Sequence, residues 1–88
     1  MSAKARILVV DDEQSMREFL QIFFQREGYE VLTAGDVGTA VMAIEADDFD
    51  VVITDMQMPD RTGLELLSEV KEVSPETLVV VISAFATT

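Results

Sequence analysis

The chain has 88 residues, enough for one small domain and too few for two, so a single core must carry its function. Hydrophobic residues make up 49% of it and charged residues 26%, a composition typical of a folded domain, and the length excludes a multidomain enzyme. Seventeen acidic residues against six scattered basic ones give a formal net charge of -11, which argues against direct binding of nucleic acid or anionic lipid by this segment.

Cysteine and histidine are both absent from the sequence. A disulfide framework, a thiolate or zinc site and a histidine-based catalytic triad are therefore excluded, which leaves chemistry based on oxygen atoms. The apolar run at residues 7–10 is too short for a signal peptide, and the run at residues 78–82 is too short to span a membrane. We expect a cytoplasmic protein without a membrane segment.

The first part of the chain predicts a strand and then an amphipathic helix. Residues 7–10 are wholly apolar, as in a strand buried on both faces of a parallel sheet. After Ser15, a candidate N-cap, apolar residues recur at helical spacing up to Gly28, which suits a C-terminal cap. The helical residues expected to pack in the core are Met16, Phe19, Leu20, Phe23 and Phe24.

Residues 30–34 predict a second, more polar strand at a sheet edge, and Asp36 is placed to cap the helix that follows. Residues 51–54 predict a third strand, which ends at Asp55 and is followed by a turn at residues 56–62. The next helix is broken by Pro75, and residues 78–82 predict a fourth and most hydrophobic strand. In the first of these two helices Val37, Ala40, Val41 and Ile44 are expected to face inward, and in the second Leu64, Leu67 and Val70 recur at helical spacing.

Strands that alternate with helices predict a doubly wound, three-layer α/β fold with a parallel sheet and right-handed crossovers. In such a sheet the functional crevice lies beyond the carboxyl ends of the strands. Asp11 and Asp12 follow the first strand, Asp55 follows the third, and Ser83 follows the fourth, so we expect all of them at this crevice.

Carboxylates that converge repel one another, and a hard divalent cation such as Mg²⁺ relieves the repulsion. Asp55 would then act as a nucleophile toward a phosphorylated donor and form an acyl phosphate, while Ser83 donates a hydrogen bond to the phosphoryl oxygens. Each acid taken alone is also typical of a turn or helix cap, and Asp12 could simply cap the first helix. Gly63 would permit a close backbone approach at the third helix, or serve as an ordinary turn residue.

Three segments carry a resemblance to a known family. The segments are ILVVDDE at residues 7–13, DMQMPDRTGLELL at residues 55–67 and VISA at residues 81–84. Together they resemble the receiver domain of two-component response regulators, and residues 83–88 are similar to receivers attached to sigma-54-dependent transcription activators. The resemblance implies a flavodoxin-like sheet with strand order 2-1-3-4-5.

The resemblance also implies a role for each site residue. Asp55 would accept phosphate from a sensor histidine kinase and thereby control an attached output domain. Its implied Mg²⁺ ligands are Asp12, Asp55, Asp11 partly through water, and the backbone carbonyl of Gln57. Ser83 would be the switching hydroxyl, and the small side chain of Ala84 would keep the site open.

A complete receiver continues with another helix, a fifth strand and a last helix, so residues 1–88 would hold the first four strands and three helices. A lysine that contacts the phosphoryl group would lie in the missing part, and neither Lys4 nor Lys71 stands where it could substitute. The strand at residues 78–82 would then leave an open edge beside an uncovered sheet face. We expect the chain to form homo-oligomers through that edge or that face.

The sequence is therefore compatible with three functions. The leading one is a phosphoacceptor signalling domain that is regulatory rather than enzymatic. The second is a truncated receiver-like interaction module without phosphotransfer competence. The third is a hydrolase with an aspartyl-phosphate intermediate, which is disfavoured because Gln57 stands two residues after Asp55, where such a phosphatase would carry an acid.

Overall fold

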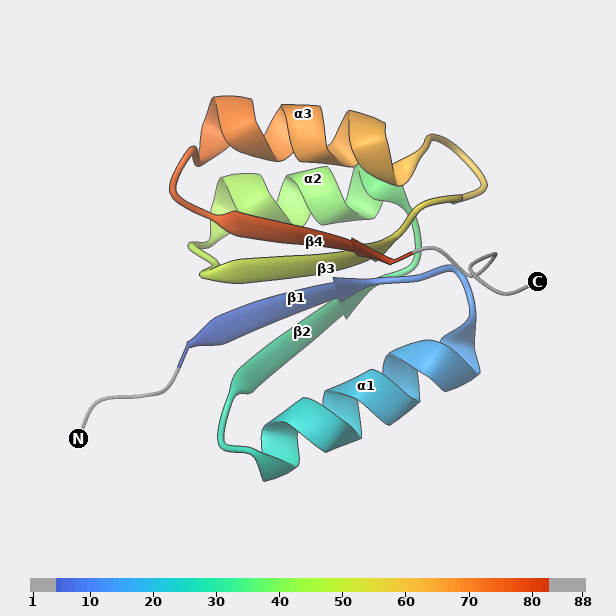
Figure 1. Ribbon diagram of the computed structural model, residues 1–88, viewed down its shortest axis with the longest axis vertical. Helices are drawn as coiled ribbons and strands as arrows, with labels where there is room; N and C mark the ends of the chain where they lie inside the picture. The colour runs from blue at the N-terminus through green and yellow to red at the C-terminus, as the bar shows by residue number, and fades with distance from the viewer. Residues whose placement is uncertain (1–4, 83–88) are drawn as a thin grey trace.

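The computed structural model describes residues 5–82 and contains strands and helices in strict alternation. Figure 1 shows one sheet with α1 on one face and α2 and α3 on the other, which confirms the predicted three-layer α/β fold. None of the helices within residues 5–82 is long and apolar enough to cross a bilayer. The elements are β1 (Arg6–Val10), α1 (Gln14–Arg26), β2 (Glu30–Ala34), α2 (Val37–Ala46), β3 (Val51–Asp55), α3 (Gly63–Val73) and β4 (Leu78–Ile82).

The sheet is parallel throughout and has the strand order β2-β1-β3-β4. β1 lies in its interior, and its residues 7–10 are all buried, as the apolar run predicts. Leu8 and Val10 join the larger hydrophobic cluster under α2 and α3, whereas Ile7 and Val9 join a smaller cluster under α1. In the sheet β1 lies between β2 and β3, so the chain moves to one side of β1 with β2 and returns to the other side with β3. This reversal of direction places the crevice at the carboxyl ends of β1 and β3.

The first helix begins one residue before the predicted cap. α1 starts at Gln14 with Glu13 at the N-cap, so the prediction of Ser15 as the capping residue is wrong. The side chain of Asp11 causes the early turn, because its Oδ1 accepts a hydrogen bond from the Glu13 amide at 2.9 Å. The C-terminal prediction is confirmed, since Gly28 has a φ of 97° just after the helix.

The predicted core face of α1 is only partly buried. Leu20 and Phe24 pack against the smaller cluster, but Met16, Phe19 and Phe23 are 40%, 62% and 48% exposed, so their assignment to the core is wrong. The reason is geometric: α1 contacts β1 and β2, and within residues 5–82 no element covers β3 and β4 on this face of the sheet.

The other two helices face the larger cluster. In α2, Val37, Ala40 and Ile44 are buried and Val41 packs against them, and Asp36 Oδ1 caps the helix by accepting from the Thr39 amide at 2.7 Å, all as predicted. In α3, Leu66 and Val70 are the buried residues, whereas Leu64 is 55% exposed and Leu67 is half-buried. Leu64 fits the predicted helical spacing but does not lie on the buried face, because the helix begins at the buried Gly63 and the residues three and seven positions later face the sheet.

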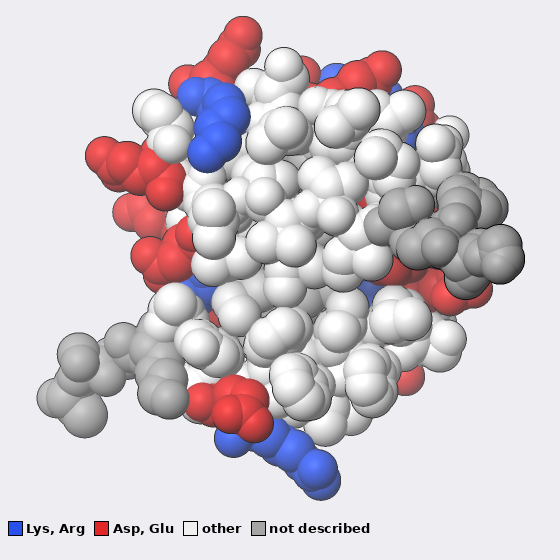
Figure 2. All heavy atoms as spheres, in the orientation of Figure 1, with Lys and Arg blue, Asp and Glu red and all other residues white. Residues whose placement is uncertain are grey.

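The fourth strand presents a row of apolar side chains to the uncovered face. Val79 packs against the larger cluster, while Leu78, Val80 and Ile82 alternate with it and are 60%, 41% and 46% exposed. Figure 2 shows this side of the molecule, and the charged side chains in view stand around its margin rather than at its centre. Among residues 5–82, β4 pairs with β3 alone.

Candidate functional site

Three carboxylates converge at the carboxyl ends of β1 and β3. One carboxylate oxygen from each of Asp11, Asp12 and Asp55 lies within 4.8 Å of the others. The register explains the convergence, because Val10 pairs with Thr54 across the two parallel strands and the acids follow directly. Asp11 and Asp55 are half-buried and Asp12 is exposed. The expectation that acids distant in the sequence share one site is therefore confirmed for these three residues.

Asp11 is held from several directions. Its amide donates to the carbonyl of Ala34 at 3.1 Å, its Oδ1 accepts from the Glu13 amide, and its carbonyl accepts from Arg17 Nη1 at 2.7 Å. The alternative that Asp12 caps α1 is wrong, because the N-cap residue is Glu13 and it makes no side-chain cap bond. The side chain of Asp11 therefore stabilises the turn before α1, and Asp12 remains exposed at the site.

The backbone on either side of Asp55 is fixed by neighbouring elements. Asp55 is the last residue of β3 and pairs with Ile82 of β4, whose carbonyl accepts from the Met56 amide at 2.9 Å. Gly63 approaches the same peptide so closely that a Cβ there would overlap the carbonyl oxygen of Asp55. The prediction that Gly63 permits a close backbone approach is thereby confirmed. This approach places the start of α3 against Asp55, the phosphoacceptor candidate.

The loop at residues 56–62 is closed on itself and anchored in the core. The Gly63 amide donates to the Met56 carbonyl at 2.7 Å, and Gln57 forms an isolated antiparallel bridge with Thr62. Met58 is only 9% exposed and belongs to the larger cluster. Gln57 itself is exposed.

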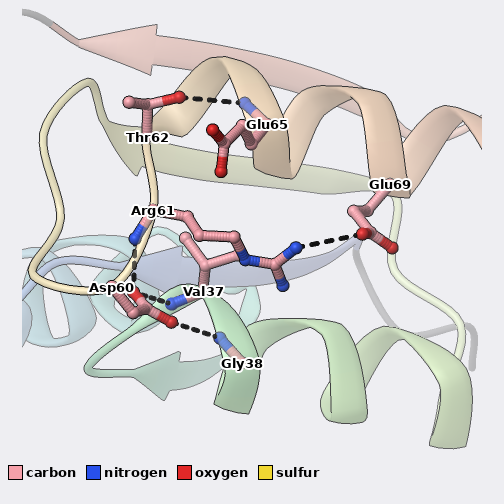
Figure 3. A network of polar contacts seen from close by, with 7 residues as sticks. All are labelled: Val37, Gly38, Asp60, Arg61, Thr62, Glu65 and Glu69. Carbon is pink, nitrogen blue, oxygen red and sulfur yellow. Dashed lines mark hydrogen bonds and ion pairs between the residues drawn. The ribbon is translucent and has the colours of Figure 1, made fainter.

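Two polar residues of this region have no counterpart in the sequence predictions. Arg17 reaches from α1 to the Asp11 carbonyl, and Asp60 reaches from the loop to the first turn of α2 (Figure 3). The backbone amide of Val37 and three further amides lower the pKa of Asp60 below its usual value, although partial desolvation opposes them. Because this folded-state pKa is depressed, Asp60 stabilises the fold above its unfolded pKa, and the stabilisation is lost as the pH falls through the folded value.

An apolar cleft of about 230 Å³ opens beside the carboxylates, between α1 and the ends of β3 and β4. Asp11 and Asp55 stand among its lining residues, together with apolar side chains from four elements, namely Val9, Val10, Met16, Leu20, Ile53 and Ile82. The acids therefore lie where a low-dielectric wall meets solvent, and such a wall strengthens their interaction with a cation. Ser83 and Ala84, the predicted switching hydroxyl and its small neighbour, lie outside the described residues.

The donor set suits a hard divalent cation. It consists of carboxylate oxygens, and Mg²⁺ prefers one or two carboxylates completed by water and phosphate oxygens. Ligands in an octahedral shell at about 2.1 Å from the ion are roughly 3 to 4.2 Å apart. Carboxylate oxygens that lie within 4.8 Å of one another are close to that spacing, so small side-chain rotations would bring them into one shell.

Comparisons with known proteins agree with this geometry. The chain is 39% identical to the DNA-binding transcriptional regulator NtrC of Azospirillum brasilense over 84 residues, which is 96% of this chain and 17% of that protein. Its structure matches the response regulator protein TrrA of Thermotoga maritima, crystallised with Mg²⁺ and BeF, with a TM-score of 0.88 and 36% identity over 94% of this chain and 72% of that one.

Two further solved structures match equally well. TrrA in complex with the histidine kinase ThkA matches with a TM-score of 0.87 and 36% identity, over 96% of this chain and 72% of that one. The beryllofluoride-activated receiver domain dimer of NtrC4 matches with a TM-score of 0.87 and 36% identity, over 94% of this chain and 69% of that one. The family model described as the response regulator receiver domain matches residues 7–88, and the chain therefore belongs to the receiver domain family of two-component response regulators.

Proposed function

We propose that this chain is a Mg²⁺-dependent phosphoacceptor and that Asp55 is the residue that carries the phosphoryl group. The convergence of the Asp11, Asp12 and Asp55 carboxylates at the ends of two adjacent strands carries the proposal. The ligands would be these three carboxylates, with Asp11 acting partly through water, and the backbone carbonyl of Gln57. TrrA, a protein of the same fold, was solved with Mg²⁺ and BeF, which supports this choice of ion.

The chemistry follows from the positions of the acids. A Mg²⁺ ion bound there would offset their charge and attract phosphoryl oxygens. A carboxylate oxygen of Asp55 attacks the phosphorus of the donor, a new P–O bond forms, and the donor leaves with the electron pair of the bond that breaks. The backbone contacts that fix Met56 and Gly63 keep the attacking carboxylate in place. Ser83 would then donate to the phosphoryl oxygens, and Ala84 would leave the donor room to approach.

The partners follow from the same proposal. The donor in the cell would be a sensor histidine kinase, since the partner of TrrA in its complex is a histidine kinase, and the chain would act in the cytoplasm. The chain spans 17% of the NtrC relative, so the control of an attached, DNA-binding output domain is proposed for the protein of which residues 1–88 form the receiver segment. The chain would act as the regulated component rather than as an enzyme, assisting only its own phosphorylation.

A small phosphodonor tests the proposal directly. Incubation of the chain with acetyl phosphate and Mg²⁺ is expected to add one hydroxylamine-labile phosphate per chain, measured by intact mass spectrometry. Asp55→Asn should abolish the addition, and chelation of the metal should prevent it in the wild type. A folded wild-type chain that takes up no phosphate would instead favour an interaction module without phosphotransfer competence.

We further propose that two copies associate through the apolar face of β4. Leu78, Val80 and Ile82 form an exposed apolar row next to the strand edge, and apolar side chains of α1 extend it. A second copy presents the same apolar row and the same strand edge, so a dimer with twofold symmetry would cover the apolar rows of both copies in one contact. The dimer of the NtrC4 receiver domain is a precedent for self-association in this fold.

Sedimentation velocity tests the association. The wild type is expected to sediment as a dimer at micromolar concentration, more completely at high salt because salt screens the net charge of -11 on each copy. Val80→Lys should give a monomer, because the substitution buries a charge in the contact. Met42→Lys is the matched control, since Met42 is 69% exposed on α2, on the opposite side of the sheet. A monodisperse wild-type monomer would refute this contact.

A further inference from the structure

The carboxylate of Asp60 connects the loop after Asp55 to the start of α2. Its Oδ1 accepts from the Val37 amide at 3.1 Å and its Oδ2 accepts from the Gly38 amide at 3.0 Å. Its Oδ1 also accepts from the amide of Arg61 at 3.0 Å. Figure 3 shows both oxygens directed at the first turn of α2, with Arg61 continuing toward Glu69 of α3. One side chain thus joins two elements that the sequence separates by 23 positions.

We infer that Asp60 is a positioning residue for the metal site: by fixing the tip of the loop at residues 56–62 to α2, it holds the Gln57 carbonyl where it completes the Mg²⁺ shell. The inference rests on the proposed function, because it concerns the affinity of that same site. It assigns a role to a side chain that touches neither the ion nor the phosphoryl group.

Helix α2 does not need Asp60 in order to begin. Asp36 accepts from the Thr39 amide at 2.7 Å through its side chain, and its carbonyl accepts from the Ala40 amide at 3.1 Å. The helix is therefore already capped through Asp36, although loss of Asp60 would also leave the amides of the buried Val37 and of Gly38 without their carboxylate partner. The larger effect of losing Asp60 falls on its own loop, which has no second carboxylate to replace it at α2.

The other contacts of the loop hold its base and its middle, whereas Asp60 holds its tip. The base is closed by the hydrogen bond between Gly63 and Met56, the middle is held by the buried side chain of Met58, and Arg61 reaches Glu69 at 3.1 Å in a pair that is more than a third exposed. A surface pair of this kind contributes little to order. Asp60 lies between Met58 and Arg61 and supplies the hydrogen bonds from the tip to α2.

Gln57 transmits a movement of the tip to the site. It stands two residues after Asp55 and three before Asp60, and it is bridged to Thr62 on the opposite side of the loop. A tip released from α2 lets this narrow bridge rotate, and the Gln57 carbonyl rotates with it. Mg²⁺ demands near-ideal octahedral geometry, so its affinity is sensitive to such a displacement. Mutation of residues that orient metal ligands typically lowers metal affinity by about 10- to 100-fold. Because Asp60 is exposed, we expect its loss to lower the Mg²⁺ affinity by about tenfold, the lower end of that range.

Calorimetric Mg²⁺ titration of the full chain tests the inference with a matched control on the same helix. Asp60→Ala is expected to raise the dissociation constant by about tenfold. Asp60→Asn keeps one acceptor oxygen and turns an amide donor toward the other backbone amide. Its Mg²⁺ dissociation constant should therefore lie between those of the wild type and Asp60→Ala. Asp36→Ala removes the side-chain cap of α2 and leaves the loop contact intact. It should lower the urea midpoint and leave the Mg²⁺ dissociation constant at the wild-type value.

The outcomes separate this inference from the proposed function. Wild-type binding with an unchanged constant in Asp60→Ala would overturn the inference alone, and so would a loss in Asp36→Ala equal to that in Asp60→Ala. A wild-type chain that binds no Mg²⁺ would overturn the proposed function and the inference together. Should Asp60→Ala fail to fold, the Asp60→Asn variant decides, since a wild-type constant in that variant contradicts the inference.

Discussion

Asp12→Asn is expected to raise the free energy of unfolding in metal-free buffer, even though it removes a residue of the functional site. Its carboxylate lies within 4.8 Å of two others, and each such pair of charges costs about 0.9 kcal/mol at the dielectric constant of water and about 3.5 kcal/mol at an effective value of 20. Asp12 is exposed, so the lower figure applies, and relief of two repulsions gives a gain of about 1 to 2 kcal/mol.

Saturation with Mg²⁺ should remove this advantage. An ion that binds only the folded state stabilises the wild type by about 1.4 kcal/mol at ten times its dissociation constant, whereas the variant gains little. Urea unfolding followed by circular dichroism, with Mg²⁺ or with a chelator, measures both effects. Asp48→Asn is the matched control, because it also changes the net charge of -11 by one but removes an exposed acid outside the cluster. An equal gain in Asp48→Asn would show that net charge, and not the cluster, sets the effect.

Gly63→Ala is expected to destabilise the fold by about 2 to 3 kcal/mol, the upper range for adding a methyl group to a filled space. Helix propensity alone predicts the opposite sign, since alanine is favoured over glycine in a helix by about 1 kcal/mol. Sterics prevail here because the new Cβ would overlap the carbonyl oxygen of Asp55 and lie 3.2 Å from the Cα of Met56. Both are backbone atoms held by β4, so they have little freedom to move aside.

Gly38→Ala provides the matched control for that prediction. Its Cβ would have ordinary contacts at 3.7 Å with the side chains of Asp36 and Asp60, so the propensity gain of up to about 1 kcal/mol should appear as increased stability. Urea midpoints of the two variants should therefore move in opposite directions. Gly63→Ala should also reduce the phosphorylation rate, because the displaced peptide belongs to Asp55. Equal or increased stability of Gly63→Ala would refute the close approach at this position.

The central strands and the site were predictable from the sequence because their signals are local. Residues 7–10 are apolar at every position, which is the pattern of a strand with both faces covered, and the structure buries each of them. Parallel pairing then brings the residue after each strand to one edge. The convergence of Asp11 and Asp12 with Asp55 needs nothing more than this rule. Ser83 and Ala84 lie outside the described residues, so their roles stay predictions.

The predictions that failed depended on tertiary context. The periodicity of α1 identifies an apolar face, but it cannot tell how much of the sheet that face covers, and Phe19 is 62% exposed as a result. Leu64 and Leu66 both fit a helical period, and only the inward position of Gly63 decides between them. Asp60 and Arg17 act through backbone groups of other elements, and a pattern of neighbouring residues contains no sign of such partners.

Equilibrium Mg²⁺ binding tests most directly whether the three carboxylates form one Mg²⁺ site around Asp55. Titration of the wild type at neutral pH is expected to show one ion per chain. Asp12→Asn should weaken binding at least tenfold, whereas Asp48→Asn should leave the dissociation constant unchanged. Binding that is absent from the folded wild type, or that is equally tight in Asp12→Asn, would contradict the account.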